Sequence, residues 1–138
     1  MMQRVNWEEY ALSLAKCAKI RSEDVYKQVG ACALSHDNRV LGVAYNGLKS
    51  GKNVSDDFWL DRDGRRPYML HAETNLLSLF KRDECKILAV TLLPCDCCAR
   101  MIAAWNISNV VYEEEYEHSQ QSKDIFKFYD INLIKLTI

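Results

Sequence analysis

The segment that decides the fold runs from residue 71 to residue 98 and reads HAETNLLSLFKRDECKILAVTLLPCDCC. Apolar residues recur at helical spacing over 71–81, so this part predicts an amphipathic helix. Residues 87–93 form a nearly continuous apolar run that stops at Pro94, which is typical of a buried strand. Residues 97–105 then predict another helix. The segment therefore indicates a helix, a central strand and a helix, with reactive side chains near the start of each helix.

A histidine opens this segment and a Cys-x-x-Cys pair closes it. One imidazole and two thiolates are a ligand set of catalytic zinc sites, which keep a fourth position open for water. Cys95 and Cys98 lie three residues apart at a helix start, so both sulfurs can face one point, which His71 approaches across the strand. Glu73 is too close to His71 to share the metal, but it can meet the water. We therefore expect one catalytic Zn²⁺ ion on His71, Cys95 and Cys98, with Glu73 as proton shuttle.

A closed structural zinc site is the alternative interpretation of the same residues. Cys97 would supply its fourth ligand, and Glu73 would be an ordinary surface charge. However, adjacent residues on a helix point about 100° apart, so Cys97 and Cys98 are poorly placed to share one metal. The pattern also has a carboxylate where catalysis needs one, which favours the open catalytic site.

The rest of the chain alternates between helix and strand patterns. Residues 6–20 predict an opening helix, and 29–34 and 40–45 predict the two strands of a hairpin. The stretch 46–67 has little apolar periodicity and exceeds an ordinary connection, which is typical of a functional or mobile loop. The remaining expected elements are a strand at 110–112, a helix at 122–129 and a strand at 131–136. This order predicts an α/β fold with helices on the faces of a five-stranded mixed sheet.

Composition narrows the class of protein. With 138 residues, 49% of them hydrophobic, the chain suits one domain over residues 1–138. A net charge of -1 provides no basic field for a long nucleic acid, so we expect a small-molecule ligand. The first residues lack the apolar stretch of a secretory signal, and no apolar run approaches the ~20 residues that span a bilayer. Six cysteines then indicate thiols or metal ligands in a soluble, cytoplasmic protein without a membrane segment.

The zinc residues belong to longer motifs that match one known family. Those motifs are His71-Ala72-Glu73-Thr74-Asn75 and Pro94-Cys95-x-x-Cys98-Ala99. Further matches are Ser22-Glu23-Asp24, Gln28-Val29-Gly30-Ala31, Tyr45-Asn46-Gly47, Ser55-Asp56-Asp57 and Tyr116-Glu117-His118-Ser119. Through these motifs almost the whole chain resembles the cytidine deaminase superfamily, and within it the deoxycytidylate (dCMP) deaminases.

The resemblance implies a three-layer α/β/α fold of the cytidine deaminase type, in a homo-oligomer that is expected to be a hexamer. It also implies hydrolytic deamination of dCMP to dUMP with release of ammonia, which supplies dUMP for thymidylate synthesis. Two alternatives stay open. One is a deaminase of another cytosine or adenine nucleoside or nucleotide, such as dCTP, cytidine or an adenosine in transfer RNA. The other is a zinc-stabilised interaction domain without turnover.

Substrate contacts are implied by the resemblance as well. It places Asn46 at the sugar, although Asn-Gly on local sequence alone indicates a turn. The other expected contacts are Ala72, Ser22, Lys27, Tyr26 and Tyr116. Among these, Lys27 is the candidate for the 5′-phosphate, since it lies in a segment that leads into a strand bordering the site. A solvated surface position is the plainer interpretation of any lysine.

The segment after Asn46 departs from the family pattern. Gly51, Asp56 and Asp57 correspond to the loop that holds triphosphate effectors in regulated members. Lys49 stands where the family commonly has proline, and Lys52 where it commonly has a cysteine that binds a second zinc in some members. Allosteric control and a second metal therefore stay open.

Plainer interpretations are favoured for a cysteine and three arginines. Cys97 stands where the family often has glutamate, and we expect a spare thiol. Arg62, Arg65 and Arg66 carry charge that suits phosphate, but the pattern around them favours a solvated loop.

Overall fold

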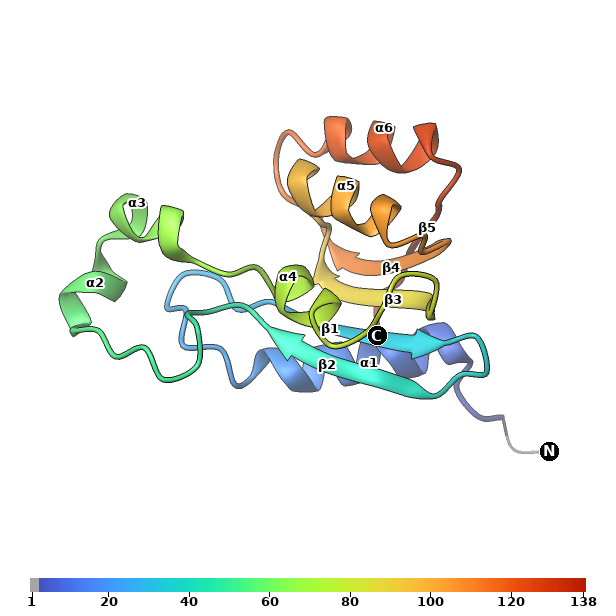
Figure 1. The fold of residues 1–138 in the computed structure, drawn as a ribbon, viewed down its shortest axis with the longest axis horizontal. Coiled ribbons are helices and arrows are strands. Elements are labelled where there is room, and N and C mark those ends of the chain that lie inside the picture. The colour runs from blue at the N-terminus through green and yellow to red at the C-terminus, as the bar shows by residue number, and fades with distance from the viewer. Residues whose placement is uncertain (1–2) are drawn as a thin grey trace.

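The computed structural model describes residues 3–138 as a three-layer α/β/α arrangement (Figure 1). Met1 and Met2, which the predicted 1–138 domain includes, lie outside the described residues. The strands are β1 (Gly30–Ser35), β2 (Val40–Tyr45), β3 (Cys85–Leu92), β4 (Asn109–Glu114) and β5 (Asn132–Lys135). The helices are α1 (Trp7–Lys19), α2 (Asp56–Leu60), α3 (Arg62–Arg65), the 3₁₀ turn η1 (Arg66–Tyr68), α4 (Ala72–Leu77), α5 (Asp96–Ala104) and α6 (Gln120–Phe128). Among residues 3–138, no helix has both the length and the apolar character needed to cross a membrane.

The strands form one mixed sheet in the order β2-β1-β3-β4-β5. β1 runs antiparallel to both of its neighbours, whereas β3, β4 and β5 are mutually parallel. The strands connected through α4, α5 and α6 all point the same way, because β2 and β3 are each antiparallel to β1. The predicted α/β fold with a five-stranded mixed sheet is therefore confirmed.

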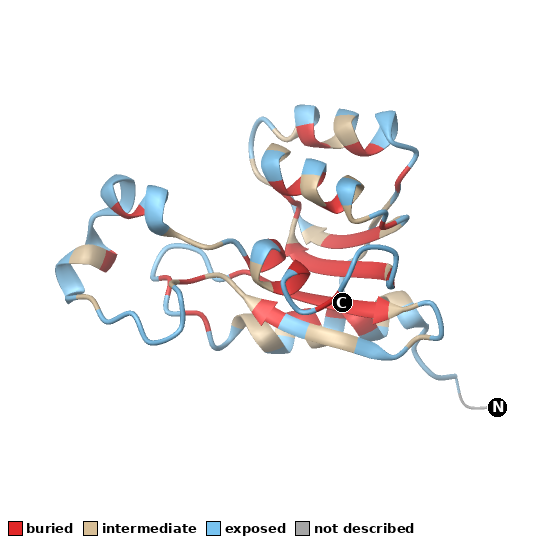
Figure 2. Cartoon of the chain, viewed as in Figure 1, coloured by how far each residue is buried: buried red, intermediate tan, exposed pale blue. Residues whose placement is uncertain are grey.

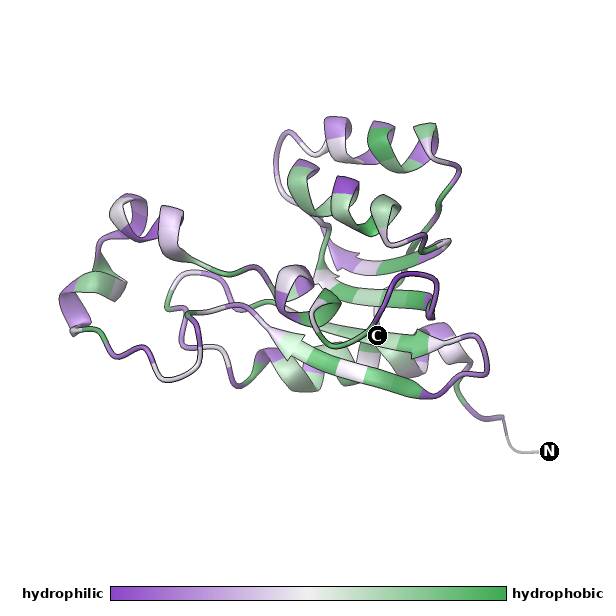
Figure 3. Ribbon diagram, in the orientation of Figure 1, coloured by the Kyte–Doolittle hydropathy of each residue, from purple (hydrophilic) through white to green (hydrophobic). Residues whose placement is uncertain are grey.

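Helices cover both faces of this sheet. On one face α1 packs through Leu12 and its neighbours against alternate residues of β1, β3 and β4. On the other face α4, α5 and α6 join a larger core that includes Leu88 and Val110. Figure 2 shows the buried residues concentrated along the central strands, and Figure 3 shows that these strands are hydrophobic while polar residues lie on the outer sides of the helices. Burial on both faces explains why β3 has no polar alternation.

A close approach of α1 to β1 positions the segment between them. A Cβ atom built on Gly30 would lie 1.9 Å from the carbonyl oxygen of Ala15, so only glycine fits there. The first residues of β1 pair with the last residues of β3, as in Ala31 opposite Val90. Residues 20–29 are therefore held at the end of the sheet where β1 begins and β3 stops, next to the cysteine motif.

The stretch 46–67, which the sequence pattern predicts as a loop, contains local structure. Residues 55–69, here called the arm, form α2, α3 and η1 and extend past the ends of the strands (Figure 1). The ring of Phe58 packs against those of Trp59 and Tyr68, with centroids 5.6 Å and 6.2 Å apart. The Asp61 side chain accepts the Gly64 N–H at 3.0 Å and starts α3. The loop prediction is wrong here because helices of four or five residues are too short to show a helical period.

The helix predicted at 71–81 is also shorter in the structure. α4 ends at Leu77, and the Leu79 N–H bonds to the Leu76 carbonyl at 3.0 Å in a tighter turn. This turn returns Phe80 to the core, where it is 9% exposed. The apolar spacing therefore reflects a short helix and a turn that share one buried side.

Candidate functional site

Three side chains meet where α4 and α5 begin. His71 immediately precedes α4 and Cys95 immediately precedes α5. His71 Nδ1 lies 3.6 Å from Cys95 Sγ and 3.4 Å from Cys98 Sγ. All three candidate ligand atoms lie within 4.8 Å of one another. The structure therefore brings together the three residues that the sequence singles out as metal ligands.

The spacing of these atoms fits a tetrahedral zinc ion. Bonds of about 2.3 Å to sulfur and about 2.0–2.1 Å to nitrogen place the two ligand atoms about 3.6 Å apart across a tetrahedral angle. Within residues 3–138, the cluster includes no fourth ligand from His, Cys, Asp or Glu. The exposed Cys97 thiol instead accepts a hydrogen bond from Arg100. The residues fit a zinc ion with three protein ligands and one free position, rather than the closed site.

Hydrogen bonds among the three ligands prepare them for a cation. The bond from Cys98, supported by His71, lowers the pKa of the Cys95 thiol to about 3. The same bond, together with burial, raises the pKa of Cys98. The bond with Cys95 raises the pKa of His71. A divalent cation bound here would replace these shared protons, because thiolate and neutral imidazole are the forms that bind metal.

Glu73 lies in the first turn of α4, beside the metal ligands, and is 4% exposed. Burial raises the pKa of its carboxyl to about 7. A carboxyl group that titrates near neutral pH can both accept and donate a proton. Its position next to the free metal position is therefore the one expected for a proton shuttle.

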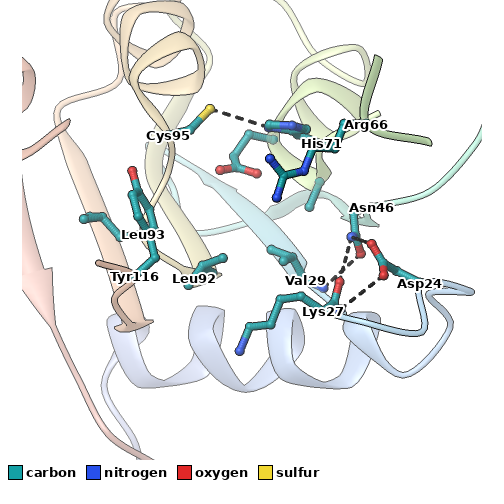
Figure 4. Close-up of a pocket in the computed structure, with 12 residues that line it drawn as sticks. Asp24, Lys27, Val29, Asn46, Arg66, His71, Leu92, Leu93, Cys95 and Tyr116 are labelled. Atoms are coloured by element: carbon teal, nitrogen blue, oxygen red, sulfur yellow. Dashed lines mark hydrogen bonds between the residues drawn. The ribbon is translucent and has the colours of Figure 1, made fainter. Parts of the chain in front are cut away.

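Two of the metal ligands, His71 and Cys95, line a cavity of about 500 Å³ (Figure 4). This volume lies within the roughly 300–1,000 Å³ of small-molecule sites. Its apolar wall consists of Val29, Ala72, Leu92 and Leu93, and its polar groups outside the metal cluster are Asp24, Lys27, Asn46, Arg66, Glu73 and Tyr116. The Tyr116 hydroxyl donates to the Pro94 carbonyl at 3.1 Å, which holds its ring in place. The lining suits a flat ring with a charged group at one end.

The Asn46 amide, just after β2, is held by four hydrogen bonds. Its oxygen accepts from the Ser22 hydroxyl at 2.7 Å and from the Val29 N–H at 2.9 Å. Its nitrogen donates to the Lys27 carbonyl at 2.9 Å and to the Asp24 carboxylate at 3.3 Å. A substrate contact must therefore share or replace one of these bonds, of which the one to Asp24 is the longest.

The expected substrate contacts divide into two groups. Those that line the cavity are Asn46, Ala72, Lys27 and Tyr116. Ser22 is 6% exposed and binds Asn46 from behind the wall. The Tyr26 hydroxyl donates to the Leu60 carbonyl in the arm at 2.7 Å. The structure therefore places Ser22 and Tyr26 as supports of the wall.

Two cations line the cavity, and they differ in their partners. The Lys27 ammonium pairs with Glu114 at the end of β4. Arg66 has a looser partner, since its Nε lies 3.8 Å from an oxygen of the exposed Asp63. The sequence pattern favours a solvated loop for all three arginines, and the structure contradicts this for Arg65, whose side chain is 7% exposed in an ion pair. Arg66 stays 68% exposed, and it also borders the cavity because the arm returns toward α4. Only the group of arginines at 62–66 signals such a role in the sequence.

The possible effector residues lie outside the cavity. Gly51 adopts a φ of +86° in a turn, on the wall of a separate surface hollow. Asp56 and Asp57 are exposed in the first turn of α2. Their role stays a prediction.

A histidine, two thiols and a buried carboxyl group beside a nucleotide-sized cavity define the class of zinc-dependent deaminases. Residues 5–114 match the model of the cytidine and deoxycytidylate deaminase zinc-binding region. This match covers most of the chain, and the protein belongs to this family. Zinc is accordingly its metal.

Named relatives align with more of the chain than residues 5–114. The chain is 31% identical to deoxycytidylate deaminase of Mus musculus, over 96% of this chain and 81% of that protein. It is 34% identical to deoxycytidylate deaminase of Mycobacterium phage D29, over 83% of this chain and 99% of that protein. The dCMP deaminase of cyanophage S-TIM5, solved with dCMP and dUMP, superimposes with a TM-score of 0.82 at 24% identity, covering 98% of this chain and 100% of that one. This likeness confirms the predicted cytidine deaminase-like fold.

Proposed function

We propose that this protein catalyses the hydrolytic deamination of dCMP to dUMP and ammonia. The reaction supplies dUMP for thymidylate synthesis. One observation carries the proposal above the others: the buried Glu73 carboxyl lies beside a three-ligand metal cluster at the wall of a cavity of about 500 Å³. The proposal is supported by the relatives named deoxycytidylate deaminase and by the cyanophage structure with dCMP and dUMP.

Glu73 performs the proton transfers of the reaction. When bound, zinc supplies the positive charge that lowers the pKa of a water molecule at its free position. Glu73 accepts a proton from the attacking water and delivers a proton to N3 of the cytosine ring. It then takes the second proton of that water, now on the C4 hydroxyl, and delivers it to the amino group, which leaves as ammonia while the C4 carbonyl forms. Its pKa near 7 suits both directions of transfer, because each costs little near neutral pH.

The cavity wall orients the nucleotide for this attack. The side chains of Val29 and Leu92 hold the pyrimidine ring away from bulk water, with Ala72 and Tyr116 beside it. The Asn46 amide contacts the sugar. To do so, it shares or gives up its longest hydrogen bond, the one to Asp24. A fixed ring position matters because attack at C4 requires near-contact geometry.

The 5′-phosphate is bound by Lys27 and Arg66, the two cations of the wall. Arg66 contributes more, because its guanidinium can grip two phosphate oxygens and has only a loose carboxylate partner. Lys27 must share its charge with Glu114. Both residues therefore favour a nucleotide over a nucleoside.

Arg66→Gln is expected to raise KM for dCMP by about 10- to 100-fold and Lys27→Gln by about tenfold or less, with kcat little changed. Neither change should alter KM for deoxycytidine, which has no phosphate. Initial rates with the two substrates measure the effect, and Arg39→Gln at the exposed hairpin turn is the control. An equal loss on both substrates would contradict the phosphate role.

Ammonia release decides the substrate class. The zinc-loaded protein is incubated with dCMP, deoxycytidine, dCTP and a transfer RNA, and we expect the highest kcat/KM with dCMP. Turnover of the transfer RNA alone would show a different deaminase. Release of no ammonia from any of the four by the zinc-loaded protein would indicate the zinc-stabilised interaction domain.

A homo-oligomer is proposed as the working form, and the family resemblance indicates a hexamer. Large exposed apolar side chains, such as Ile20, Leu60 and Phe128, are consistent with subunit contacts. Sedimentation equilibrium gives the subunit number.

All six cysteines are free, which supports a reducing compartment such as the cytoplasm.

A further inference from the structure

A buried ion pair between Asp24 and Arg65 joins the arm to the segment before β1. Arg65 Nη1 lies 2.7 Å from Asp24 Oδ2, and the two side chains are 7% and 6% exposed. Of the ion pairs found within residues 3–138, the Asp24–Arg65 pair is the only one in which both side chains are more than nine-tenths buried. The desolvation of two charges commonly cancels their attraction, so stability alone does not account for the pair.

The Asp24 carboxylate organises two groups of the cavity wall at once. Its Oδ1 accepts the backbone N–H groups of Tyr26 at 2.8 Å and of Lys27 at 3.1 Å. Its Oδ2 accepts from Arg65 and from the Asn46 amide. Figure 4 shows Asp24 beside Asn46 at the cavity wall. With four donors on one carboxylate, a change at Asp24 displaces both Asn46 and the backbone of Lys27.

The Arg65 guanidinium organises the other side of the cavity. It lies over the Tyr26 ring, 4.8 Å from the ring centroid. The Tyr26 hydroxyl in turn binds the Leu60 carbonyl of the arm. Arg66 is the next residue in the chain and lines the cavity. The backbone position from which Arg66 reaches the cavity is therefore set by the contacts of Arg65.

We propose that Asp24 and Arg65 form a positioning pair for the nucleotide. The pair holds the Asn46 amide and the Arg66 guanidinium at the separation that the sugar and the phosphate require. It takes no part in proton transfer: Arg65 acts through Asp24 and Tyr26, and Asp24, although it borders the cavity, is occupied by its four donors. This inference rests on the proposed function, because the two groups that it aligns are those assigned to the sugar and the phosphate.

The test compares Arg65→Gln with the double variant Asp24→Asn/Arg65→Gln. The single change leaves the Asp24 charge buried without a partner, whereas the double change removes both charges and the cost of burying them. Arg82→Gln is the matched control, since Arg82 forms an exposed ion pair with Asp83. Each variant is measured for thermal midpoint, zinc content, kcat and KM with dCMP, and dissociation constant for dUMP.

Both Arg65 variants are expected to raise KM for dCMP and Kd for dUMP by about tenfold or more, with kcat within about threefold of the unaltered protein. Zinc content and the Arg82→Gln control should not change. A double variant that recovers its thermal midpoint and also has unaltered KM and Kd would overturn the proposal, since the pair would then act only on stability. A loss confined to kcat, or a failure of both Arg65 variants to fold, would overturn it as well. If the unaltered protein does not turn over dCMP, the proposed function fails, whereas dUMP binding still reports on the pair.

Discussion

Replacing Glu73 with alanine is expected to lower kcat on dCMP by about three to four orders of magnitude. Each turnover requires both protons of the attacking water to be moved, one to N3 and the other to the departing ammonia. Glu73 is the buried carboxyl group at the metal cluster, and neither His71 nor the thiols are free to replace it, because they hold the metal. The loss should appear mainly in kcat, while KM changes little.

Two comparisons separate this chemical role from a structural one. Glu73→Gln keeps the shape of the side chain but cannot accept a proton, so it should lose as much activity as the alanine variant. Glu84→Ala removes an exposed carboxylate at the other end of β3 and should retain full activity. Zinc content and thermal midpoint are measured for all three variants. Activity above about a tenth of the unaltered value in folded, zinc-loaded Glu73→Ala would exclude the proton-shuttle role.

Cys98→Ala is expected to lose zinc as well as activity. Within residues 3–138, three protein atoms are placed to hold the ion, so removing one thiolate would take away a third of these ligands and one of the two negative charges. We expect zinc content to fall from about one ion per chain to below about 0.1 after dialysis, and activity to fall with it. The thermal midpoint should no longer rise when zinc is added, because a ligand stabilises only the state that binds it.

Cys97→Ser is the matched control for this loss. Cys97 is next to Cys98 in the sequence, yet its exposed sulfur lies outside the ligand cluster. The serine variant should keep its zinc, its activity and the stabilisation by added zinc. Metal analysis by mass spectrometry and thermal scans with and without zinc measure both variants. A full complement of zinc in Cys98→Ala, or its loss in Cys97→Ser, would show that the ligand assignment is wrong.

Much of the architecture could be predicted because local patterns and tertiary packing agree. The apolar run before Pro94 became the buried β3, and the β-rich runs on either side of the turn at 36–39 became the hairpin of β1 and β2. The metal cluster could be predicted for a similar reason. Cys95 and Cys98 are separated by one helical turn, and His71 lies one strand earlier, so secondary structure alone nearly brings them together.

The arm and the substrate wall could not be predicted in the same way. Short helices such as α2 and α3 have no period to detect, and their positions depend on contacts with residues far away in the sequence. Asp24 and Arg65 are 41 positions apart, and neither has a local pattern that indicates burial. Arg65 shows the consequence, because its charge predicts a solvent-exposed position, whereas its ion pair with Asp24 holds it buried.

Local sequence patterns were enough to predict the mixed α/β sheet, the three candidate zinc ligands and the carboxyl group beside them. These features follow from hydrophobic period and from donor atoms that lie within a few residues of one element. By contrast, three features became visible only in the folded chain: Lys27 has Glu114 as a partner, Ser22 and Tyr26 lie behind the wall, and Arg66 lines the cavity. The physical reason is that long-range ion pairs and hydrogen bonds are satisfied between segments whose separation leaves no periodic trace in the chain.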